Sequence, residues 1–260
     1  MNILAFFAHP DDETMACGAT LALAARHSRL TILCATRGEG GERGDPSLCT
    51  REELGALRTE ELRCAAQELG AIGLEFLDYI DPTIGPDNAL YSFTDDEERL
   101  AQQIVEAIRK TRADLLITHG TNGEYGHPAH KQCNRGAHRA KEILGQYAPL
   151  FYTVQAAFPG IPRPRFANID DPAHLILDLE PYRDVKIAAA LCHRSQHDLF
   201  VRQDSKDAGR LVSVAETIES LESVHRVHPP VPAQTPVQDE FAELLRASGL
   251  ACENSEWLSP

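Results

Sequence analysis

Two short clusters of histidine and carboxylate residues are the parts of this 260-residue chain best suited to chemistry. The first reads A-H-P-D-D-E at residues 8–13, and the second reads H-G-T-N-G-E-Y-G-H-P-A-H at residues 119–130. Imidazole and carboxylate groups are the ligands that zinc and similar divalent metals favour. Together the clusters supply the ligands of a catalytic metal, which keeps one position open for water. We therefore predict a metal site that activates water.

Each cluster also has a plain structural interpretation. Asp11 or Asp12 would cap the helix that follows, because aspartate side chains commonly accept hydrogen bonds from the first amides of a helix. Two histidines three residues apart, such as His127 and His130, often occur without a metal. Neither cluster alone decides between the interpretations, but two clusters at the ends of two strands reinforce the metal prediction.

The elements that must position these clusters are two buried strands. Residues 3–7 read I-L-A-F-F and residues 115–118 read L-L-I-T, continuous apolar runs that are typical of parallel strands covered on both faces. Open α/β sheets bind ligands at the carboxyl ends of such strands. In the second cluster Pro128 suits the first helical position, so we expect His127 at the N-cap and His130 in the first turn.

The rest of the chain alternates strands and helices, which predicts an α/β fold with a mostly parallel sheet and helices on both faces. We expect a single domain over residues 1–260, with a core at 1–200 and a Pro-rich C-terminal extension at about 225–260. The further predicted strands are 30–35, 74–77, 150–156 and, as the last one, 175–179; the predicted helices are 15–27, about 50–69, 94–108, 128–144, 182–196 and 241–246.

Composition narrows the classes of partner. The formal net charge of −14 gives a surface that repels phosphate backbones, so nucleic acid is not an expected partner. No apolar stretch reaches the roughly 18–20 residues that a membrane span needs. Seven cysteines without a C-x-x-C pair, and no signal peptide, predict reduced thiols in a cytoplasmic protein. The oligomeric state is left open, a homo-oligomer included.

Three loops are expected to set specificity: residues 37–49, 79–93 and the Pro-rich segment 158–172. The first begins in a polar stretch with four glycines that lacks the phosphate-binding patterns. We interpret it as a wall of the pocket, with Arg37 and Arg43 as substrate contacts; a mobile, solvated loop is the alternative.

Further along the chain, the stretch C-H-R-S-Q-H at residues 192–197 offers one more substrate contact, Gln196. Its two histidines, His193 and His197, have the four-residue spacing of metal ligands on a helix, but no partner ligand is evident. In the first cluster, Glu13 is expected to orient an imidazole rather than to bind metal.

The pairing of A-H-P-D-D-E after the first strand with G-H-P-x-H after a later one resembles the PIG-L/LmbE-type zinc-dependent deacetylases. The resemblance extends from Met1 to about Gln196 and implies a Rossmann-like fold. It implies that His9, Asp12 and His130 hold the metal. The implied metal is Zn²⁺, with Fe²⁺ or Mn²⁺ as alternatives.

The same resemblance implies catalytic roles for three other residues. Asp11 is the expected general base, His127 assists catalysis, and Tyr125 lies near the reacting carbonyl. The expected function is removal of the acetyl group from an N-acetyl amino sugar, an N-acetylglucosaminyl conjugate in particular. Two alternatives stay open: an amidase for a larger acyl group or a thiol conjugate, and a carbohydrate-binding protein that kept the metal without catalysis. An intact Asp11 argues against the second alternative.

Overall fold

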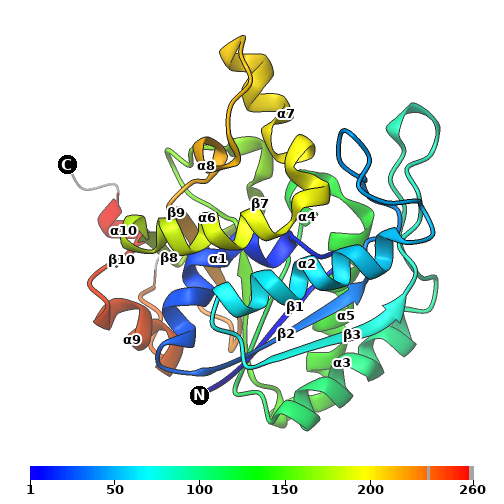
Figure 1. Ribbon diagram of the computed structural model, residues 1–260. Helices are drawn as coiled ribbons and strands as arrows, with labels where there is room; N and C mark the ends of the chain where they lie inside the picture. The colour runs from blue at the N-terminus through cyan, green and yellow to red at the C-terminus, as the bar shows by residue number, and fades with distance from the viewer. Residues whose placement is uncertain (233–234, 258–260) are drawn as a thin grey trace.

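The computed structural model describes residues 1–232 and 235–257 of the chain. Its main feature is an eight-stranded sheet of order β10-β8-β9-β5-β4-β1-β2-β3 (Figure 1). The strands of this sheet are β1 Asn2–Phe7, β2 Arg29–Thr36, β3 Gly73–Tyr79, β4 Leu115–Thr118, β5 Leu150–Val154, β8 Leu175–Asp178, β9 Leu221–His228 and β10 Ala251–Glu253. A small parallel pair, β6 Ala156–Ala157 and β7 Asn168–Pro172, forms a second sheet.

Helices cover both faces of the sheet, as predicted (Figure 1). The helices are α1 Asp12–Ala25, α2 Leu54–Glu68, α3 Glu97–Thr111, α4 Gly123–Gly126, α5 Pro128–Leu144, α6 Arg183–Cys192, α7 His197–Ala208, α8 Val214–Thr217, α9 Glu240–Ala247 and α10 Asn254–Trp257. One core joins the sheet to α1, α2, α6 and α9, and a second core joins it to α3 and α5. This confirms the three-layered α/β architecture. No helix within the described residues is both long and apolar enough to cross a membrane.

The strands β3, β2, β1, β4 and β5 are parallel neighbours. From β1 the chain adds β2 and then β3 on one side. It then crosses over to the other side of β1, where it adds β4 and then β5. The carboxyl ends of β1 and β4 flank the point where the order reverses, and doubly wound sheets bind their ligands at such a point. Both predicted clusters leave these two strand ends.

The C-terminal part of the sheet corrects the sequence prediction. Residues 175–179 are not the last strand, because β9 lies inside the sheet between β5 and β8, antiparallel to both, and β10 adds the edge. The packed core thus extends beyond residue 200. The predicted helix 182–196 ends at Cys192, and the predicted irregular segment 158–172 contains β7. The Pro-rich segment begins within β9, and residues 233–234 of it lie outside the described residues.

A disulfide joins Cys64 of α2 to Cys192 at the end of α6, with a Cα–Cα distance of 5.7 Å. The prediction that all thiols are reduced is wrong for this pair. The two cysteines lie 128 residues apart in sequence, and they meet because α2 packs beside α6 on the same face of the sheet. Sequence spacing contains no sign of that contact.

Candidate metal and catalytic site

The first cluster forms the sharp turn between β1 and α1. Asp11 occupies the N-cap position of α1 with φ 115° and ψ −29°, and its side chain accepts no capping hydrogen bond. Left-handed backbone is unfavourable for aspartate, and such strain persists mainly at functional sites. Asp12 accepts a hydrogen bond from the amide of His9 at 2.8 Å. The turn is therefore built to present side chains rather than simply to begin a helix.

The second cluster follows β4 and leads into α5. Nδ1 of His127 accepts the amide hydrogen of Ala129 at 3.2 Å, and Pro128 is the first residue of α5. This confirms His127 as the N-cap and His130 in the first turn. The N-cap role also fixes a proton, because an Nδ1 that accepts a hydrogen bond leaves the ring hydrogen on Nε2.

The two clusters meet in a buried group of rings and carboxylates. Oδ1 of Asp12 lies 3.2 Å from Nε2 of His130, and Oδ2 lies 3.2 Å from Nδ1 of His9. Within residues 1–232 and 235–257, two sets of ligand atoms lie close enough to share one cation: His9, His127 and His130, or Asp12, His119 and His130. The fold brings the predicted ligands His9, Asp12 and His130 together. His9 belongs to the first of these sets, Asp12 to the second, and His130 to both.

Glu124 fixes the orientation of two of these imidazoles. Its Oε2 accepts from Nδ1 of His130 at 2.6 Å and from Nδ1 of His119 at 3.0 Å. Its Oε1 accepts from the amide of Gly120 and the side chain of Asn168. Burial would raise the pKa of Glu124, but these histidines outweigh burial and hold its pKa well below the ordinary range. Sequence reasoning missed Glu124, which lies in the short helix α4 with a non-helical φ of 56°.

Hydrogen bonding distinguishes the imidazoles from one another. Nε2 of His130 is buried without a hydrogen-bond partner, while its Nδ1 is held by Glu124. His119 has no free nitrogen, because its Nε2 accepts from the amide of Ala8 at 3.1 Å. The ring of His127 keeps its hydrogen on Nε2, and burial together with His130 and His9 lowers its pKa to about 3. A buried nitrogen lone pair beside a carboxylate suits a divalent cation, so the donor set fits a metal at His130.

Arg58 of α2 holds the Asp11 carboxylate in place. Its guanidinium donates to Oδ2 of Asp11 at 3.0 Å, to the carbonyl of Gly38 at 2.9 Å, and to the carbonyl of Pro10. A Cβ at Gly38 would lie 2.1 Å from this guanidinium, so the glycine permits the approach. Burial raises the pKa of Asp11 to about 6, against the opposing charge of Arg58.

Asp81 is a further carboxylate at the site. Its Oδ1 lies 3.2 Å from Nε2 of His9, and its other oxygen accepts from the amide of Gly40. A Cβ at Gly40 would lie 2.0 Å from the carbonyl oxygen of Pro82. The glycine-rich loop thus packs against the loop that carries Asp81. The sequence indicated both loops, but it singled out neither Asp81 nor Arg58, whose roles depend on contacts across the fold.

The remaining predicted residues lie in different surroundings. Tyr125 is 51% exposed, with its ring edge-on to those of His127 and His130, so it lies at the mouth of the site. The guanidinium of Arg37 donates hydrogen bonds to the side chains of Thr59 and Asp78. Arg43 lines an open cavity of about 440 Å³ with acidic residues and Arg202. Gln196 is 1% exposed and donates to the carbonyl of Glu42, which leaves its side chain no open face for a substrate.

Curated proteins that are similar to this chain include several deacetylases. An inositol-linked N-acetylglucosaminide deacetylase, "1D-myo-inositol 2-acetamido-2-deoxy-alpha-D-glucopyranoside deacetylase 2" of Catenulispora acidiphila, is 33% identical over 175 residues. The match covers 61% of this chain and 57% of that protein, so this chain spans little more than half of its length. The Streptomyces griseus deacetylase of the same description is 30% identical, covering 75% of this chain and 74% of its own. The "Probable N-acetyl-alpha-D-glucosaminyl L-malate deacetylase 2" of Bacillus anthracis is 29% identical, and the match covers 85% of this chain and 92% of that protein.

Solved structures share the fold at lower identity. The hydratase GalB of Pseudomonas putida superposes with a TM-score of 0.58 at 22% identity, covering 89% of this chain and 98% of its own. The zinc-inhibited form of the teicoplanin deacetylase Orf2 superposes with a TM-score of 0.58 at 18% identity, and the match covers 88% of this chain and 100% of the Orf2 chain. A hydratase and a deacetylase on one fold show that function must be argued from the site.

The family model described as PIG-L, GlcNAc-PI de-N-acetylase, matches residues 4–141, just over half of the chain. That segment contains both strand-end clusters, Arg58, Asp81 and Glu124. With the matched segment and the coverage of the Streptomyces relative, this chain belongs to the PIG-L family of de-N-acetylases.

Proposed function

We propose that this protein is a metal-dependent hydrolase that removes the acetyl group from an N-acetylglucosaminyl conjugate. The observation that carries the proposal is the buried Nε2 of His130, fixed by Glu124 and directed at Asp12 in the turn that also holds Asp11. The names of the relatives support the substrate class, because they describe deacetylases of N-acetylglucosamine linked to inositol or to malate.

His9, Asp12 and His130 are the residues that would hold the metal. When bound, a divalent cation polarises an amide carbonyl and makes water easier to deprotonate. Two imidazoles and a carboxylate suit zinc, and also Fe²⁺ and Mn²⁺. The zinc-inhibited state of Orf2 is a reason to test all three metals.

The chain's own residues provide the acid–base chemistry. Asp11, held by Arg58, takes a proton from the attacking water, whose oxygen bonds to the acetyl carbon. The Nε2 hydrogen of His127 donates to the carbonyl oxygen as negative charge develops there. Breaking the C–N bond requires a proton on the amine nitrogen, and Asp11 supplies the one it has taken. The products are acetate and a free amino sugar, and Tyr125 lines the entrance.

Other parts of the sequence interpretation stay predictions. A cytoplasmic location, a homo-oligomer and the absence of nucleic-acid partners are untested. So are the rival functions, an amidase for a larger acyl group or thiol conjugate and a binding protein without catalysis. Substrate contacts by Arg37 and Arg43 are kept as proposals, whereas the buried position of Gln196 removes the reason to propose it.

Incubation with a panel of amides tests the function. We expect one divalent ion per chain, loss of turnover after chelation, and recovery with Zn²⁺, Fe²⁺ or Mn²⁺. Free amine should form fastest from an N-acetylglucosamine glycoside with a neutral aglycone, because the protein carries a net charge of −14. Malate glycosides, acetylated peptides and N-acyl thiol conjugates complete the panel. Preference for the peptide, or no amine from any compound in the presence of metal, would contradict the proposal.

Glu124→Gln should weaken metal binding by about 10-fold to 100-fold, the usual effect of losing a group that orients a ligand. All four of its contacts are donors, so an amide nitrogen in either orientation would face another donor. Competition titration with a zinc chelator measures the affinity. Glu142→Gln, an exposed residue of α5 paired with Arg139, is the matched control. Equal affinities for both variants would mean that Glu124 does not orient His130.

A further inference from the structure

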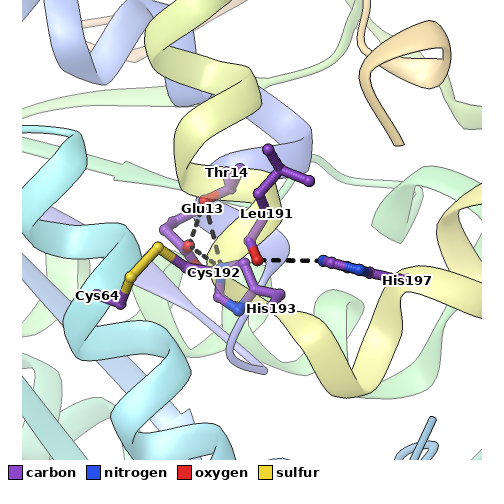
Figure 2. Close-up of a disulfide and its surroundings, with 7 residues drawn as sticks. All are labelled: Glu13, Thr14, Cys64, Leu191, Cys192, His193 and His197. Atoms are coloured by element: carbon purple, nitrogen blue, oxygen red, sulfur yellow. Dashed lines mark hydrogen bonds and ion pairs between the residues drawn. A yellow bond between two sulfur atoms is a disulfide. The ribbon is translucent and has the colours of Figure 1, made fainter. Parts of the chain in front are cut away.

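A buried pair of ionisable side chains lies next to the strained turn, and none of the chemistry above uses it. Nε2 of His193 lies 3.1 Å from Oε1 of Glu13. His193 is 0% exposed and Glu13 1% exposed. The hydroxyl of Thr14 donates to the same Glu13 oxygen at 2.6 Å. Figure 2 shows these three residues grouped beside the Cys64–Cys192 disulfide.

The second oxygen of Glu13 reaches the proposed general base. Oε2 of Glu13 accepts the amide hydrogen of Asp11 at 3.0 Å. Asp11 has its φ at 115°, so its amide points in a direction that ordinary helical or extended backbone would not give it. A carboxylate that accepts this hydrogen compensates for the strained conformation. The predicted role of Glu13, orienting an imidazole, holds in part: its partner is His193 rather than a metal ligand.

The position of His193 is fixed from α2. Its neighbour Cys192 is bonded to Cys64 of that helix. Two residues further on, Ser195 donates its amide and its hydroxyl to Glu61, also on α2, at 2.8 and 2.7 Å. The same helix carries Arg58, which holds the side chain of Asp11. The backbone and the carboxylate of Asp11 are thus supported by two groups that are tied to each other.

Other roles for His193 fit less well. It is too buried to touch a substrate. His197, its possible partner in metal binding, instead directs Nε2 to the carbonyl of Leu191 at 3.2 Å, as Figure 2 shows. Nδ1 of His193 is buried without a hydrogen-bond partner. The contact between Nε2 and Glu13 gives a reason for an imidazole in this position, despite the cost of burying Nδ1 without a partner.

We propose that His193 is a positioning residue that acts through Glu13 to hold Asp11 in the backbone conformation required of the general base. The proposal rests on the proposed function, since it assigns a purpose to the geometry of Asp11. It extends the active site to the end of α6, beyond the segment 4–141 that the family model matches.

The test compares substitutions of His193 in the full-length, metal-loaded protein. His193→Leu should lower kcat roughly 100-fold, the scale of effect expected when a catalytic group shifts by about 1 Å. KM and metal affinity should change less than about twofold, because His193 contacts neither ligand nor substrate. His193→Gln, whose amide can still donate to Glu13, should recover most of kcat. His197→Leu is the matched control on the same segment and should leave kcat unchanged.

A double-mutant cycle separates positioning from general destabilisation. In the Asp11→Asn background, His193→Leu should cost nothing further, because the group that it positions is already lost. An equal loss in both backgrounds would overturn the proposal. So would a fall in metal affinity that matches the fall in kcat. If His193→Leu does not fold, His193→Asn replaces it, since its shorter side chain stays polar but does not reach Glu13.

Hydrogen exchange gives a readout that needs no activity. The amide of Asp11 should exchange faster in His193→Leu than in the wild-type protein. The amide of Thr20, which lies further along α1 and donates to Glu222 of β9, should keep its protection. If the wild-type protein deacetylates no compound, the proposed function is refuted. Faster exchange at Asp11 in His193→Leu would still support the structural link from His193 through Glu13 to Asp11. Unchanged protection and unchanged kcat would refute the link itself.

Discussion

Replacing Asp11 with asparagine is expected to lower kcat by about 100-fold to 10,000-fold, the usual contribution of a general base. Asparagine matches aspartate in size and can still accept a hydrogen bond from Arg58 at the position of Oδ2. It cannot take a proton from water. Metal content should stay at the wild-type level, because the proposed ligands are unchanged. Steady-state kinetics paired with metal analysis measures both quantities.

The control is Asp178→Asn, on an exposed residue at the end of β8, which β9 and β5 separate from β4 in the sheet. It should leave kcat and metal content at wild-type values. Activity of Asp11→Asn within a few-fold of wild type, at equal metal content, would show that another group takes the proton. Loss of metal in this variant would instead make Asp11 part of the metal site.

Alanine substitutions at His127 and His130 should have opposite effects. Within the part of the chain that the structure describes, His130 is the imidazole whose Nε2 is buried without a hydrogen-bond partner. His130→Ala should therefore lower metal affinity by more than about 100-fold, the upper range for residues that only orient a metal ligand. His127→Ala should retain the metal and lose about 100-fold to 1,000-fold in kcat, because it removes a hydrogen-bond donor to the developing oxyanion. Calorimetric titration of zinc into both metal-free variants, with kinetics on the loaded forms, measures the difference.

The hydrogen-bond pattern is the reason for this assignment. His127 accepts at Nδ1 and carries its hydrogen on Nε2, whereas His130 donates from Nδ1 and has a free Nε2. If His127→Ala is the variant that loses metal, the two roles are exchanged, and the set His9, His127 and His130 becomes the better description of the site. His138→Ala, further along α5, serves as a control for removing a histidine from the same helix.

Local signals in the sequence predicted the parts of the site that depend on neighbouring residues. Apolar runs located β1 and β4, and Pro128 located the N-cap at His127. Arg58 and Asp81 were missed because each reaches the site through contacts across the fold. Glu124 lies within the second cluster, but its contacts with His119 and His130 depend on the backbone conformation of that segment. In a sequence, a lone arginine within a helix or a glutamate flanked by glycines has many possible roles, and only the packed structure distinguishes among those roles.

The missed strand β9 has a similar explanation. Its sequence L-E-S-V-H-R-V-H places charged and polar residues in the middle of a sheet, where an apolar run is expected. Glu222 is buried there because it accepts from Lys186 at 2.7 Å and from Thr20, both on helices that cover the sheet. A buried charge with matched partners removes the apolar pattern on which strand prediction depends.

The order of the strands has a consequence for how the chain is made on the ribosome. β1 leaves the ribosome well before its partner β4, which begins only at Leu115. At about 5–20 residues per second, roughly 5 to 20 seconds pass before that partner is synthesised. During this interval the backbone N–H and C=O groups along one edge of β1 are open to pairing with other chains. His193 is made later still, so a nascent chain that already contains every proposed metal ligand has yet to gain the support under Asp11.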